Sequence, residues 1–218
     1  MTHESRDSDN RNPFAALRRM ARQATTQAAE HCDLCGEILP SEHRHLLNLA
    51  AREILCACRA CVILLNSPIA GGGARRLIPT RCLYLENFEL TDAQWESLQI
   101  PVNIAFFCYN SITQQTTAFY PSPMGPTESL LPLTTWDDLK ERNPILQQME
   151  PDVEALLVNR GRDETDCYLA PIDECYRLVG LMRFHWRGIS GGSAVREEIG
   201  HFFTQLRERA DQTGGVNA

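Results

Sequence analysis

The sequence lacks any apolar run long enough to span a bilayer. Its longest apolar stretches, such as "CVILL" and "IAFFCY", are far shorter than the roughly 20 residues that a membrane helix needs. Residues 1–12 are polar and mixed in charge, and they lack the apolar core of an export signal. We therefore expect a cytoplasmic protein.

The chain also lacks an excess of positive charge, and Lys140 is its only lysine. Its 21 Lys and Arg are outnumbered by 28 Asp and Glu, which gives a formal net charge of -7. Such a surface disfavours a phosphate backbone as partner, so we do not expect nucleic acid to be bound. Common enzyme signatures are absent too, including the P-loop, the kinase motifs and His-Glu-x-x-His. We expect no enzyme.

Cysteine, in contrast, is abundant. The chain has nine, and five of them lie within residues 32–61. Clustered Cys-x-x-Cys pairs and an odd total suit a reducing compartment and a metal better than disulfides. The two-residue spacing lets both sulfurs of a pair face one ion, and two such pairs complete a tetrahedron. We predict that one metal ion is bound by Cys32, Cys35, Cys58 and Cys61.

The fifth cysteine of this segment, Cys56, is an alternative ligand. It could replace Cys58, but a pair of Cys56 with Cys61 would lack the two-residue spacing, so Cys58 is preferred. Cys56 is then expected to pack beside a ligand. Three nearby histidines are further alternatives, each more simply explained as a surface residue or as a neighbour of a ligand: His31, His43 and His45.

The type of ligand favours zinc. Four thiolates in a reducing compartment form a typical structural zinc site, which leaves no coordination position open for catalysis. Iron is the alternative, because mononuclear iron and iron–sulfur clusters also use cysteine thiolates. A symmetrical iron site prefers glycine after both pairs, whereas Gly36 follows the first pair and Val62 the second.

The segment that holds the cysteines predicts a small metal module. "CDLCGE" has the form of a zinc knuckle, in which Gly36 lets the backbone turn. "RHLLNLA" and "REILCAC" predict two strands joined by a tight turn near residues 50–52, and the apolar run after Cys61 predicts a short helix. A knuckle, a hairpin and a cysteine pair at the start of a helix resemble a treble-clef or zinc-ribbon module.

The rest of the chain predicts a mixed α/β domain with a largely antiparallel sheet, so the fold class is α+β. Strands are predicted in "RCLYLEN", "VNIAFFCYNS", "TTAFYP", "VEALLVN" and "CYLAPI", and the proline-rich "YPSPMGPTES" is expected to be a loop. Pro68 and three consecutive glycines mark a linker. The predicted division is a disordered tail (1–11), an N-terminal helix plus the metal module (12–66), the linker (67–76), the α/β domain (77–210) and a disordered tail (211–218).

Two further features could be sites but have simpler explanations. The Gly-rich turn after His185 and Arg187 could hold an anion at a helix N-terminus, but a cap by Ser190 or Ser193 accounts for it. The four cysteines outside the metal module lie in apolar stretches and are expected to be buried, unreactive thiols: Cys82, Cys108, Cys167 and Cys175.

Several segments, taken in order, resemble the bacterial family DUF5947. They are the cysteine segment, "LQIPVNIAFFCYNS", "AFYPSPMGPTES", "EPDVEALLVNR" and "CYLAPIDECYRLVGLMRFHWRGISGG", and they run from about Cys32 to Arg209. The resemblance implies a gene context, because genes of this family often accompany those for uptake nickel–iron hydrogenases and their maturation factors. The resemblance implies no catalytic residues for this chain. The only residues that it marks are the five cysteines of the metal segment.

The closed metal site and the resemblance together lead to a predicted function. We expect a non-catalytic metal-binding accessory protein that assists assembly or maturation of a nickel–iron hydrogenase. Its partner would be a hydrogenase subunit or a maturation factor. One alternative is an electron-transfer or iron-delivery protein that uses the same thiolates. Another is a nucleic-acid-binding zinc finger protein, which the acidic charge disfavours.

Overall fold

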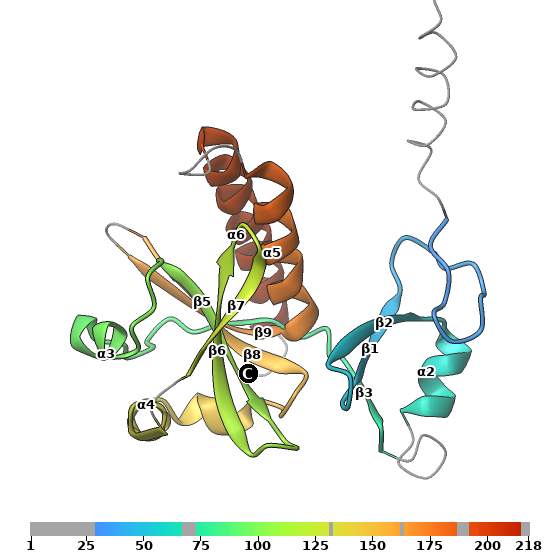
Figure 1. Ribbon diagram of the computed structural model, residues 1–218, viewed down its shortest axis with the longest axis horizontal. Coiled ribbons are helices and arrows are strands. Elements are labelled where there is room, and N and C mark those ends of the chain that lie inside the picture. Colours follow the sequence, from blue (N-terminus) through green and yellow to red (C-terminus); the bar gives the residue numbers. More distant parts are fainter. Residues whose placement is uncertain (1–28, 67–72, 131–132, 162–163, 187–191, 215–218) are drawn as a thin grey trace, which may run out of the picture.

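The computed structural model describes residues 29–66, 73–130, 133–161, 164–186 and 192–214 (Figure 1). The predicted N-terminal tail, nearly all of the predicted helix that follows it, and most of the linker lie outside these residues. Within them, helices combine with two antiparallel sheets, which confirms the α+β class. No helix in the described part of the chain has both the length and the apolar character needed to cross a membrane.

The first part of the chain forms a three-stranded sheet with one helix, made of β1 (Arg44–Asn48), β2 (Glu53–Ala57), α2 (Arg59–Leu65) and β3 (Arg75–Leu77). The strands are ordered β2-β1-β3, and β1 and β2 form the hairpin that the sequence predicted. Strand β3 comes from residues assigned to the end of the linker and the start of the next domain, and it pairs Leu77 with Leu46. We call residues 29–66 together with β3 the N-terminal unit.

The second part builds a six-stranded sheet with helices. Its strands are β4 (Leu83–Tyr84), β5 (Ile104–Asn110), β6 (Gln115–Ser122), β7 (Gly125–Leu130), β8 (Glu154–Arg160) and β9 (Thr165–Pro171). Its helices are α3 (Asp92–Ser97), α4 (Leu133–Arg142), the 3-10 helix η1 (Pro144–Gln148), α5 (Ile172–His185) and α6 (Gly192–Gly214). The strand order is β4-β9-β8-β5-β6-β7, and every neighbouring pair is antiparallel.

Two hydrophobic cores lie on opposite faces of this sheet. Successive side chains of a strand point to opposite faces. Leu157 therefore packs in the core shared with α5 and α6, whereas Leu156 packs in the core beneath α3, α4 and η1. Figure 1 shows α5 and α6 side by side against the sheet. The central strand β5 is buried on both faces, as its continuous apolar run predicted.

The prediction of a loop for "YPSPMGPTES" is wrong. This segment is the end of β6 and the start of the edge strand β7, with Pro121 opposite Pro126. Proline is tolerated here because β7 has no further neighbour in the sheet and the pairing of β6 with β5 ends at Phe119. The two prolines lack a backbone N–H, but this removes no hydrogen bond from the pairing of β6 with β5.

The N-terminal unit shares a core with the large sheet. Leu47 and Leu49, from β1 and the turn after it, belong to the cluster that α5 and α6 cover. Ile78, directly after β3, belongs to it as well. The predicted boundary at residues 67–76 stays a prediction, but this contact couples the stability of the two parts.

A buried carboxylate also joins the two parts. Asp152, directly before Val153 and β8, is 0% exposed. Arg52 Nη1 lies 3.1 Å from its Oδ1, and Arg76 Nη1 lies 3.3 Å from its Oδ2. The backbone N–H of Ser111 donates to Oδ1 at 2.9 Å. Both arginines belong to the N-terminal unit, so Asp152 ties that unit to the large sheet.

Candidate metal centre

The first cysteine pair lies in a tight turn before β1. The N–H of Cys32 donates to Glu37 O at 2.8 Å, and the N–H of Gly36 donates to Cys32 O at 2.8 Å. Gly36 has a φ of +78°, a left-handed conformation that side chains disfavour. This is the role that the knuckle motif predicted for it.

Replacing Gly36 with alanine is expected to weaken metal binding about fivefold. A Cβ at this position would meet no atom within 4 Å, so the cost arises from the backbone conformation alone, at about 1 kcal/mol. Competition with a chelator would measure the change. Gly180→Ala in α5 is the control, because alanine is the better helix former there and should leave metal affinity unchanged.

Asp33 holds this turn against the hairpin. Its Oδ2 accepts a hydrogen bond from the N–H of Cys56 at 2.6 Å, and its own N–H donates to Cys56 O at 2.9 Å. Cys56 lies on β2, two residues before Cys58. The two bonds therefore place the first cysteine pair beside the second.

The second pair starts α2. Cys58 is the N-cap of the helix, and its sulfur accepts from the N–H of Cys61 at 3.5 Å. The helix begins at Arg59, before the apolar run from which it was predicted. Cys61 therefore lies in the first turn of α2, three residues after the N-cap Cys58.

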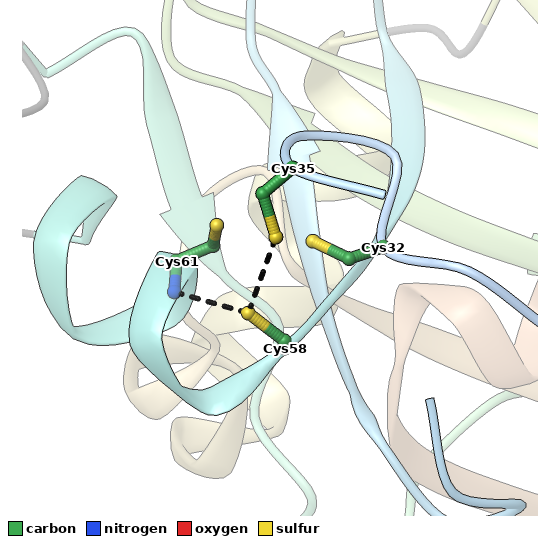
Figure 2. Close-up of side chains that lie close together, drawn as sticks. All are labelled: Cys32, Cys35, Cys58 and Cys61. Atoms are coloured by element: carbon green, nitrogen blue, oxygen red, sulfur yellow. Dashed lines mark hydrogen bonds between the residues drawn. The ribbon is translucent and has the colours of Figure 1, made fainter. Parts of the chain in front are cut away.

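The four predicted cysteines meet in one cluster (Figure 2). Their sulfur atoms all lie within 4.8 Å of one another, and Cys35 Sγ is 3.7 Å from Cys58 Sγ. A tetrahedral ion with zinc–sulfur bonds of about 2.3 Å separates its sulfurs by about 3.8 Å, so the spacing suits such an ion. All four thiols are free. The cluster could hold a metal ion.

The four thiols do not ionise alike. Burial opposes ionisation of Cys32, but hydrogen bonds from the backbone of Cys58, Leu34 and Cys35 lower its pKa to about 6. Burial, together with hydrogen bonds among the cysteines, raises the pKa of Cys61 to about 12. The Cys32 thiolate is therefore favoured without metal, whereas a bound cation must displace the proton of Cys61.

The structure places Cys56 apart from this cluster. Its sulfur lies within 4.8 Å of ring nitrogens of His43 and His45. His31, the other histidine considered as a ligand, forms a β-bridge with Ile38 and joins neither group among the described residues. Sequence reasoning considered these residues as substitutes in the first cluster, as neighbours of its ligands or as surface residues, and not as a group of their own. The signal that it missed is a His-x-His pair at the start of β1 with Cys56 opposite His45 on β2.

Residues 31–210 match the family model described as a family of unknown function, DUF5947. The chain belongs to this family. The DUF5947 match includes both cysteine pairs as well as His43, His45 and Cys56, and it confirms the resemblance noted from the sequence. No curated protein and no solved structure gave a significant match.

The other cysteines of this DUF5947 chain are buried, as predicted. Burial raises the pKa of Cys82 and Cys167 to about 12 and that of Cys108 to about 11. It raises the pKa of Cys175 as well. These thiols therefore stay protonated at neutral pH. The Gly-rich turn considered as an anion site falls largely in residues 187–191, which lie outside the described part.

Proposed function

We propose that this DUF5947 protein is a non-catalytic metal-binding accessory protein that acts by contacting another protein. The observation that carries the proposal is an apolar surface on the N-terminal unit. Ile38 is 65% exposed, Ile63 68% and Leu64 59%. We call these three residues the apolar patch. Ile38 and Ile63 line one cavity and Leu64 follows Ile63 in α2, and exposed apolar side chains gathered in this way are typical of protein-binding sites.

The patch adjoins the cysteine cluster. Ile38 and Ile63 line one cavity of about 400 Å³, whose wall also includes Cys58. Ile38 lies three residues after Cys35, and Ile63 lies two residues after Cys61. Each side chain is therefore close to a cysteine pair. A bound ion would therefore fix the shape of the surface, as structural metal ions do in small modules.

Zinc is the ion that we propose for the four cysteines. Four thiolates close the coordination sphere, which suits a structural role and leaves no position for a substrate. Iron would use the same donors in the electron-transfer or iron-delivery alternative. Elemental analysis of the full chain, purified without added metal, distinguishes the two, and visible absorption from ferric thiolate would favour the iron alternative.

The proposed partner is a hydrogenase subunit or a maturation factor of a nickel–iron hydrogenase. The support for this partner is the gene context that family membership implies. A patch of isoleucine and leucine suits an apolar segment of such a partner, and residues of this kind bury well in the centre of an interface.

Ile63→Asp is expected to weaken capture of the partner by at least tenfold. A charge in the centre of an apolar contact costs more than 1.4 kcal/mol, which corresponds to about tenfold in affinity. The full-length variant would be compared with the wild type in a pull-down and in a strain that lacks the gene. The variant should restore less active hydrogenase than the wild type does, with hydrogenase transcripts unchanged.

Met124→Asp is the matched control. Met124 is 90% exposed, but it lies in the turn between β6 and β7, away from the patch. This variant should capture the partner and restore hydrogenase activity. Normal hydrogenase activity in the deletion strain would contradict the assembly role. A fall in transcript would favour the nucleic-acid-binding alternative.

A further inference from the structure

A second group of metal-ligating side chains lies on one face of the β1–β2 hairpin. His45 lies in β1 and His43 directly precedes Arg44, the first residue of that strand, and the centroids of the two rings are 4.9 Å apart. Cys56 is directly opposite His45 in the antiparallel pair. One ring nitrogen of each histidine and the Cys56 sulfur lie within 4.8 Å of one another. Three potential ligands therefore converge on one point.

Within the described part of the chain, His43 has a buried ring nitrogen without a hydrogen-bond partner. Its Nδ1 is 3.1 Å from Pro40 O, and since a carbonyl oxygen only accepts, Nδ1 carries the hydrogen. The Nε2 atom has no hydrogen-bond partner among the residues that the structure describes, although the side chain is only 7% exposed. An unsatisfied buried polar atom destabilises the folded state. A cation at Nε2 would remove that destabilisation.

His45 is held in the orientation of a metal ligand. Its Nδ1 is 2.7 Å from Asp173 Oδ2 in the first turn of α5. The other oxygen of Asp173 accepts from the N–H of Glu174 at 2.9 Å, which fixes the carboxylate. A carboxylate on one ring nitrogen orients a histidine and leaves the second nitrogen to bind metal.

We propose that His43, His45 and Cys56 form a second metal site, which binds a divalent ion of the zinc class and leaves one coordination position open. Two imidazoles and a thiolate are a donor set that suits zinc and its neighbours. Both histidines, though not Cys56, line a cavity of about 460 Å³, so open space adjoins two of the three proposed ligands. This site goes beyond the structural role proposed for the four cysteines, because three protein ligands do not close a tetrahedron.

A catalytic thiol is the competing explanation for part of this group. Cys56, His45 and Asp173 together have the composition of a Cys–His–Asp triad. That arrangement leaves the buried Nε2 of His43 unexplained. A metal ion accounts for all three side chains and for the carboxylate behind His45.

The full-length protein should bind two equivalents of Zn²⁺ or Co²⁺ that survive removal of excess metal. His43→Gln and Cys56→Ser should each bind one equivalent. His31→Gln is the matched control and should bind two, since His31 lies in the same unit but outside the group. Native mass spectrometry measures the stoichiometry, and thermal unfolding checks that each variant is folded.

Asp173 is a positioning residue in this proposal. Asp173→Asn should weaken metal binding at the second site about 10- to 100-fold, as measured by chelator competition. Metal affinity of the four-cysteine cluster should stay unchanged. A purely structural role would lower the unfolding temperature without this selective loss of affinity.

Wild-type protein alone can overturn the proposal, so the test does not depend on the buried variants folding. Saturation of the wild-type protein at one equivalent of metal would overturn the proposal. Binding of two equivalents by folded Cys56→Ser would overturn it as well. The third measurement is alkylation of Cys56 by iodoacetamide. Protection by Zn²⁺ supports the site, whereas equal reaction with and without Zn²⁺ would favour the catalytic thiol.

Discussion

Cys35→Ser protein is expected to lose the ion of the four-cysteine cluster and to melt at a lower temperature. Cys35 is exposed, so the change removes little buried surface and acts through the lost thiolate. Structural zinc contributes about 10–16 kcal/mol of apparent binding free energy in small zinc-finger peptides. Loss of even about 5 kcal/mol lowers the melting temperature of a chain of this size by about 10–20 °C. Elemental analysis and thermal unfolding measure both effects.

Cys56→Ser is the control for this ligand assignment. It makes the same chemical change within the same segment, but at a sulfur that lies outside the four-cysteine cluster. The cobalt-loaded variant should keep the charge-transfer absorption of a four-thiolate site, and Cys35→Ser should lose it. Wild-type metal content in Cys35→Ser, or loss of the four-thiolate spectrum in Cys56→Ser, would show that the ligands are assigned wrongly.

Asp152→Asn is expected to destabilise the protein by about 3 kcal/mol. The change removes the negative charge that Arg52 and Arg76 share but keeps the size of the side chain. Asparagine also tolerates the φ of +70° at this position, so backbone strain does not contribute. The arginine side chains are 27% and 42% exposed, and their remaining contact with water puts the cost at the lower end for a buried pair.

Thermal unfolding would show this loss as a decrease of about 6–12 °C in melting temperature. Asp138→Asn is the matched control, since Asp138 is an exposed residue of α4 and the same change there should shift the melting temperature by no more than about 1–2 °C. Equal melting temperatures for the two variants would mean that the arginines do not hold the N-terminal unit through Asp152.

Features that depend on local patterns were predictable from the sequence. Two Cys-x-x-Cys pairs identified four side chains that the structure brings together, because the spacing constrains each pair. The capping box of Thr91 and Gln94 is formed at the start of α3, since its partners lie within one turn. Strands β5 and β8 were recognisable because burial on both faces requires a continuous apolar run.

Features that depend on distant partners were not predictable. The residues of β3 show no sequence pattern typical of a strand. They are extended because they pair with β1. Asp173 lies 128 residues after the histidine that it orients. Asp152 likewise pairs with two arginines, Arg52 and Arg76, that lie far before it in the sequence. Periodicity within a short window carries no information about such contacts.

The position of β4 beside β9 sets the order in which the chain can fold during synthesis. Five of the sheet's strands form the hairpins β5–β6, β6–β7 and, later, β8–β9, whose short connections close quickly. Strand β4 pairs Leu83 with Leu169, so it waits until nearly the whole chain has left the ribosome. The cysteine pairs emerge much earlier. A metal ion could therefore bind the four cysteines before Asp152 and Asp173 have been synthesised, and the large sheet would then fold against an N-terminal unit that already holds metal.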